Sequence, residues 1–260
     1  MKTVKLIVIF LLLVMVAGFF TPSVFATAKT DYDFQWQQYR QNYSEFALLK
    51  RDYLANQTLD NQQKAILSAK QTLMARDLAK DAYARYLVDL INSQNTGYTA
   101  LNPIIDRLKA ASAFYVGEAQ LSQKIITTND LKAFALDYYD KTQIYDRSFE
   151  YGQIAVKIAT LVRFQIDLKN NFDVLVPKLP DPLPAALKAR LDEVPSLAQN
   201  INDKIATISA RIIPENEEGI LNQENYFNPF VDKLDEIKTL QLNLVNQFVD
   251  MDINYVQPKI

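Results

Sequence analysis

The chain has 260 residues, with 28 Lys and Arg against 30 Asp and Glu, and it contains neither His nor Cys. The missing His excludes the Ser-His-Asp triad and the H-E-x-x-H zinc site. The missing Cys excludes thiolate chemistry, iron–sulfur clusters, disulfides and a Cys-linked lipid. A metal would need oxygen ligands, and the acidic spots at 216–219 and 250–252 lack the spacing of a calcium loop. We therefore expect no cofactor and no metal. The near balance of charge also lacks the clustered basic excess that binds nucleic acid.

Residues 1–26 have the pattern of a secretory signal peptide. Two lysines precede an uncharged, almost wholly apolar run at 6–20, and a short polar segment with small residues follows. The small residues favour cleavage between Ala26 and Thr27. The chain is therefore expected to be exported, as a periplasmic, extracellular or cell-surface protein.

An uncleaved anchor is the competing interpretation of the same residues. Positions 6–26 are about long enough to cross a hydrocarbon core of roughly 30 Å. Pro22 and Ser23 interrupt the run, however, and no cluster of Lys and Arg follows it. Cleavage is favoured, and a retained leader would leave the protein tethered to the membrane through these residues alone.

The fold class follows from composition and periodicity. Five glycines in 260 residues are too few for the turns of a many-stranded sheet protein. Apolar residues recur at helical spacing through most of the chain. We expect an all-α fold, an elongated antiparallel bundle of about six long amphipathic helices with coiled-coil-like packing. The expected helices cover 31–55, 61–91, 102–125, 131–175, 187–212 and 228–251.

Capping and proline chemistry set the expected helix ends. Asn102 before a proline is expected to cap one helix, and residues 127–130 the next. That next helix, if unbroken to residue 175, would be about 68 Å long at 1.5 Å per residue. Pro195 is expected to kink or restart its helix, and Pro214 to end it.

Four prolines between 177 and 184 are the strongest interruption of the chain. They remove backbone donors and fix φ, so no regular helix passes through them. The expected organisation is an N-terminal helical bundle at 27–176, a Pro-rich connector at 177–184, and a C-terminal helical hairpin at 185–260. The hairpin could pack on the first part.

An aromatic heptad seam distinguishes the first expected helix. Its members recur at alternating steps of four and three and are Tyr32, Trp36, Tyr39, Tyr43, Phe46 and Tyr53, with Lys50 in the one non-aromatic place. The favoured interpretation makes the seam the core of a narrow bundle. The alternative makes it an interaction surface for a partner helix or for sugar rings, with these candidate residues: Tyr32, Trp36, Tyr39, Tyr43 and Tyr53.

The run from Tyr39 to Asp77, with Tyr-rich heptads, a Y-L-x-x-Q-T-L break and a following R-D, resembles uncharacterised exported all-helical bacterial proteins. The resemblance covers about a quarter of the chain. The family has no assigned activity, so the resemblance implies no catalytic or binding residue.

Three functions remain open. The favoured one is a non-enzymatic structural or protein-interaction module at the bacterial cell envelope, whose partner is a protein or envelope component, with oligomerisation also open. The second is a ligand-binding sensor or solute-capture domain with an apolar cavity and convergent tyrosine hydroxyls between helices. The third and least favoured is a glycan hydrolase that uses paired carboxylates.

Overall fold

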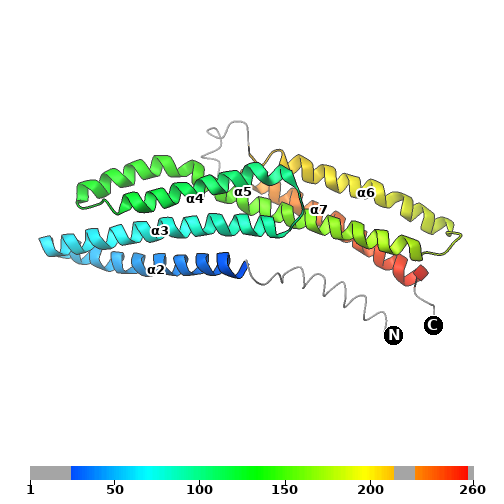
Figure 1. Cartoon of the computed structure of the whole chain (residues 1–260), viewed down its shortest axis with the longest axis horizontal. Helices are drawn as coiled ribbons and strands as arrows, with labels where there is room; N and C mark the ends of the chain where they lie inside the picture. The colour runs from blue at the N-terminus through cyan, green and yellow to red at the C-terminus, as the bar shows by residue number, and fades with distance from the viewer. Residues whose placement is uncertain (1–24, 214–225, 257–260) are drawn as a thin grey trace.

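The structure, a computed structural model, describes residues 25–213 and 226–256. These residues form no strand and six long helices: α2 Phe25–Ala55, α3 Leu59–Ser93, α4 Asn102–Ser122, α5 Thr128–Leu175, α6 Ala185–Ser209 and α7 Asn228–Met251. Figure 1 shows them running up and down along one elongated body, so the predicted all-α antiparallel bundle is confirmed. Within the described ranges, no helix combines the length and hydropathy that crossing a membrane requires.

Helix α5 runs along most of this body and packs against two groups of helices, one on each of its halves (Figure 1). Helices α3 and α4 pack on its first half, and α6 and α7 on its second half. Its 48 residues correspond to about 72 Å at 1.5 Å per residue. The sequence leaves open whether this helix continues unbroken to Leu175, and in the structure it does.

The core is closely packed around Gly152, near the middle of α5. Gly152 leaves no room for a side chain there, because an added Cβ would lie 2.9 Å from Leu87 Cδ1 and 3.1 Å from both methyls of Leu108. Tyr151 beside it is fully buried and its ring meets that of Phe227 near the start of α7. Glycine therefore lets α3, α4 and α5 approach closely at this level.

Two of the helix starts are fixed by side-chain caps. The Thr58 hydroxyl accepts a hydrogen bond from the backbone N–H of Asn61 at 3.2 Å at the start of α3. At the start of α5, Thr127 and Asp130 form a reciprocal capping box, as the sequence predicts. The prediction for Asn102 is wrong. Its own backbone is already helical and a 3₁₀ turn at Thr99–Leu101 leads into α4, so it stands inside the helix and not at its cap.

The prolines act in part as predicted. Helix α6 continues through Pro195, which lies on the exposed side, so the predicted restart does not occur. The helix ends at Ser209, before the predicted stop at Pro214, which lies outside the described residues. After α5, a 3₁₀ turn at Val176–Lys178 leads into non-helical residues up to Pro184. The expected signal peptide lies outside the described residues up to position 24, and α2 already begins at Phe25.

Helix α2 packs extensively on α3 alone. The hydroxyl of Thr72 on α3 donates to the backbone carbonyl of Asn42 on α2 at 2.9 Å, so a short side chain spans the gap between the helices. Helix α3 also buries many alanines along its length, including Ala65, Ala75 and Ala79. Such small residues let neighbouring helices approach closely. Most of the remaining surface of α2 faces outward.

Candidate functional site

The aromatic seam of α2 is divided between contact with α3 and exposure. Tyr32, Tyr39, Phe46 and Tyr53, which recur every seven residues, are half-buried. Trp36 and Tyr43 are 44% and 54% exposed. The interpretation of the seam as bundle core is therefore wrong for these two rings. The reason is that α2 has a neighbour on one side only.

The rings of the seam contact one another and α3. The Tyr32 centroid lies 5.0 Å from that of Tyr83 and 6.0 Å from that of Tyr86, both on α3. Farther along α2, the Tyr39 ring lies 5.5 Å from Trp36 and 6.1 Å from Tyr43. Rings at these separations support one another, which limits the freedom that a binding partner would have to remove.

Aliphatic and aromatic side chains extend the exposed apolar surface of α2. Phe34, Leu48 and Leu54 are each more than half exposed. Together with Trp36 and Tyr43 they place five large apolar side chains on the outside of one helix. Large rigid side chains of this kind, above all Trp and Tyr, contribute most to protein–protein binding. This set of five residues is called the α2 apolar surface below.

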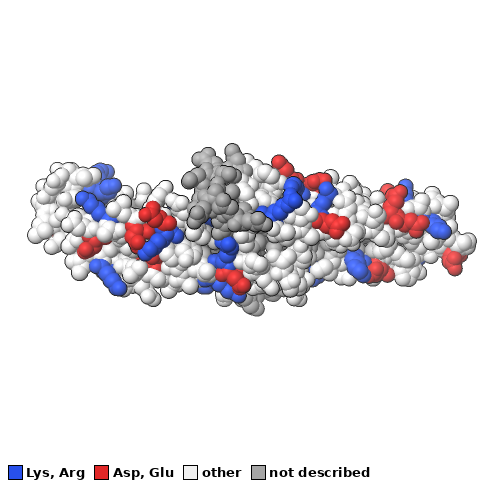
Figure 2. Space-filling view, turned by 90° about the horizontal axis from the view of Figure 1, so that it is seen from above, with Lys and Arg blue, Asp and Glu red and all other residues white. Residues whose placement is uncertain are grey.

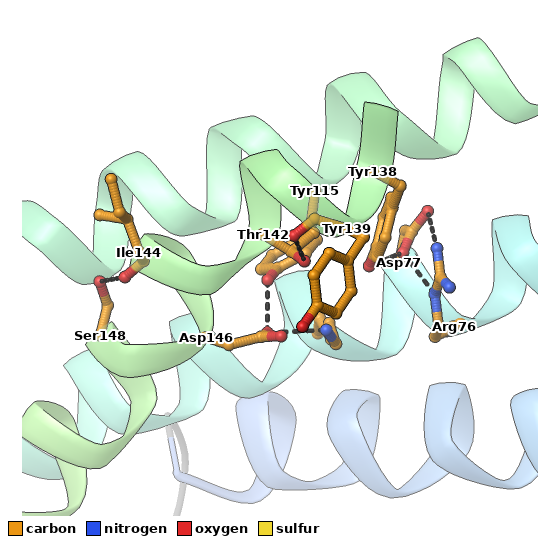
Figure 3. A network of polar contacts seen from close by, with 10 residues as sticks. Arg76, Asp77, Tyr115, Tyr138, Tyr139, Thr142, Ile144, Asp146 and Ser148 are labelled. Carbon is orange, nitrogen blue, oxygen red and sulfur yellow. Dashed lines mark hydrogen bonds and ion pairs between the residues drawn. The ribbon is translucent and has the colours of Figure 1, made fainter. Parts of the chain in front are cut away.

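A polar network lies behind this surface, between α3, α4 and α5 (Figure 3). Its centre is Asp77 on α3, which is fully buried. Asp77 accepts hydrogen bonds from the Arg76 guanidinium at 2.9 Å and from the Tyr138 hydroxyl of α5 at 2.7 Å. The guanidinium also lies over the Tyr138 ring, 3.7 Å from its centroid. The buried carboxylate is thus paired with a cation and hydrogen-bonded, as burial of a charge requires.

A second group in the same network joins all three helices (Figure 3). Asp146 of α5 accepts from the Lys80 ammonium of α3 at 2.7 Å and from the Tyr115 hydroxyl of α4 at 2.5 Å. Lys80 also lies 4.8 Å from the Tyr115 ring centroid. One turn after Asp77 on α3, the carboxylate of Asp81 accepts hydrogen bonds from Arg85 and from Ser112 of α4.

Burial keeps the tyrosines of this network protonated. It raises the pKa of Tyr115 and of Tyr138, and the neighbouring carboxylates raise both further. Burial also raises the pKa of Asp77, while Arg76 and the Tyr138 hydroxyl oppose that rise. These groups satisfy one another, and the arrangement fixes the register of α3 against α4 and α5. We assign it a structural role.

A pocket of about 520 Å³ lies where the start of α2 meets α3 and α4. Charged residues of both signs line it, among them Asp31, Arg85, Asp89 and Lys109, above the buried side chain of Leu108. No tyrosine lines it. It therefore differs from the apolar cavity with tyrosine hydroxyls that the ligand-binding hypothesis predicts.

Surface charge does not single out a nucleic-acid site on the face that Figure 2 shows, where Lys and Arg alternate with Asp and Glu and gather in no single patch. In the described parts of the chain, no group of three or more Asp and Glu is placed to hold a metal ion. Comparison with protein-family models, curated proteins and solved structures finds no match for this chain.

Proposed function

We propose that this protein is an exported helical module that binds another protein through the α2 apolar surface. The observation that carries the proposal is the position of α2. It is attached along one side to α3 and leaves two aromatic members of its own heptad seam, Trp36 and Tyr43, exposed. Trp36, Tyr43 and Leu54 lie on one side of the helix, and exposed apolar side chains gathered in this way mark interaction sites in soluble proteins.

Two further features support binding. Trp36 and Tyr43 of the α2 apolar surface contact the half-buried ring of Tyr39. Helix α2 is joined to α3 through the ring contacts of Tyr32, and α3 is held by the buried network around Asp77 and Asp146. A preordered surface loses little conformational entropy when it binds. The leader pattern at 1–26 and the lack of His and Cys support an exported, non-catalytic role.

The test is a crosslinking pull-down from the native envelope with the wild-type protein and a Trp36→Ala/Tyr43→Ala double variant. The double variant is expected to capture the partner of the wild-type protein at least ten times less efficiently, since two interface aromatic side chains contribute at least about 2 kcal/mol to the binding free energy. Tyr139→Ala is the matched control, because Tyr139 is an exposed aromatic residue on α5. Equal capture by all three proteins would contradict the proposal.

Export has its own test. Mass spectrometry of the protein recovered from its native host is expected to show Thr27 as the first residue. Recovery with residues 1–26 attached would favour the tethered form, and recovery from the cytoplasm alone would contradict export.

A further inference from the structure

A second heptad row follows α2 beside the aromatic seam and shares Trp36, Tyr43 and Lys50 with it. Its members again recur at alternating steps of four and three: Lys29, Asp33, Trp36, Arg40, Tyr43, Ala47, Lys50 and Leu54. Seven of the eight are exposed, and Asp33 is partly so. This row is called the outer seam. A helix that exposes a complete heptad row presents the surface by which two helices pack in a coiled coil.

We propose that the partner of α2 is a second copy of this chain, joined to the first by antiparallel pairing of the two outer seams. This inference rests on the proposed function, since it names the protein that the α2 apolar surface binds. Helix α2 carries four basic and four acidic residues, so its net charge of zero does not oppose self-association.

One antiparallel register matches every central layer of the outer seam. With the twofold axis between positions 41 and 42, Trp36 lies opposite Ala47 of the second copy, a large side chain against a small one. Arg40 lies opposite Tyr43, which permits a cation–π contact. Asp33, which pairs with Lys29 of its own helix at 2.6 Å, lies opposite Lys50 of the second copy, which gives it a second ion pair. The twofold axis makes each of these pairs twice.

The same residues disfavour two other arrangements. Parallel pairing in register would place Arg40 on Arg40 and Lys50 on Lys50 of the second copy. An antiparallel slip of one heptad toward the carboxyl end would place Arg40 opposite Lys50. Like charges in direct opposition are destabilising. In the structure Arg40 makes no ion pair or hydrogen bond through its side chain with a described residue, so it is available for the contact.

The outer seam is long enough for two helices to pair over several turns. It spans 29–54, about 39 Å of helix at 1.5 Å per residue. Trp36 and Tyr43, at 44% and 54% exposure, supply the apolar part of its centre, and Leu54, at 60% exposure, lies opposite Lys29 of the second copy at each end. We expect a dimer that dissociates on dilution.

Analytical ultracentrifugation of the purified exported protein over a concentration series tests the proposal. The wild type is expected to shift from monomer to dimer. Asp33→Lys and Lys50→Asp are each expected to weaken the dimer by roughly tenfold, because each places two like-charged pairs in contact. The combined charge swap is expected to restore affinity to within about threefold of wild type, since only an antiparallel register brings these two positions together.

Tyr139→Ala is expected to leave the dimer unchanged. A wild type that stays monomeric throughout the series would overturn the proposal, and so would a dimer in which the charge swap restores nothing. Neither result would refute the proposed function. The envelope pull-down with the Trp36→Ala/Tyr43→Ala variant reports separately on whether the α2 apolar surface binds a different protein.

Discussion

Removal of the Asp77 carboxylate is the sharpest test of how the first half of the bundle is held together. Asp77 is fully buried and accepts hydrogen bonds from Arg76 and Tyr138. Asp77→Ala would leave a guanidinium that is only 23% exposed without its counter-charge. Breaking a buried pair from one side costs about 3–5 kcal/mol. We expect Asp77→Ala to lower the free energy of unfolding by that amount.

Tyr138→Phe removes one hydrogen bond to the charged carboxylate and keeps the ring beneath Arg76. Its expected cost is about 1.5–3 kcal/mol. In the double variant the two losses overlap, because the Tyr138 hydroxyl has already lost its acceptor when Asp77 is absent. The coupling energy between the two sites is therefore expected to be about 1–2 kcal/mol.

Urea unfolding followed by circular dichroism at the helix band gives the free energy of unfolding of the wild type, the two single variants and the double variant. The slope of the unfolding free energy against urea should stay constant across the series, since these changes leave the buried area nearly the same. A loss below about 1 kcal/mol for Asp77→Ala would refute the reasoning. Strict additivity of the two changes would refute it as well, since residues that share a hydrogen bond must couple.

Three further predictions use the same unfolding assay or amide exchange. Gly152→Ala should destabilise the protein by about 1 kcal/mol net, since overpacking outweighs the gain in helix propensity. Gly117→Ala should stabilise it by about 0.5–1 kcal/mol, since no atom lies within 4 Å of the added Cβ. The reverse order of stability would contradict the packing described. Burial raises the pKa of Glu118 above its ordinary 4.5, so its contribution to stability is present below that pH and is lost as pH rises through the raised value. Glu118→Gln should accordingly be the more stable protein at neutral pH and lose its advantage in acid, and parallel pH profiles would count against this. Backbone hydrogen bonds lower the pKa of Asp130, so its support of α5 should disappear only as pH falls through that lowered value, and Asp130→Ala should speed exchange of the Thr127 amide at neutral pH.

Most of the fold was accessible from the sequence because its signals are local. Helical periodicity, the Thr127 cap and the prolines after Leu175 mark element ends within a few residues. Asn102 misled because a residue type that favours caps can also sit in the first turn, and the 3₁₀ turn before it has no strong pattern. The restart predicted as one alternative at Pro195 does not occur, because an exposed proline can remain inside a helix that tertiary packing supports.

The polar network was not predicted, although α3 carries a trace of it. Asp77 and Asp81 stand on buried positions of a helix that is otherwise rich in alanine there. A charged residue in the apolar phase of a helix signals a buried pair, but its partners Tyr138 and Ser112 lie on other helices. The division of the aromatic seam was equally out of reach. Periodicity shows that a row exists, and only the number of neighbouring helices decides how much of it is covered.

The continuity of α5 has a mechanical consequence. Since one helix of 48 residues passes through both groups of packed helices, bending this body across its long axis requires α5 itself to bend. A pulling force along the axis of the molecule would therefore act on the backbone hydrogen bonds of α5, one after another along the helix.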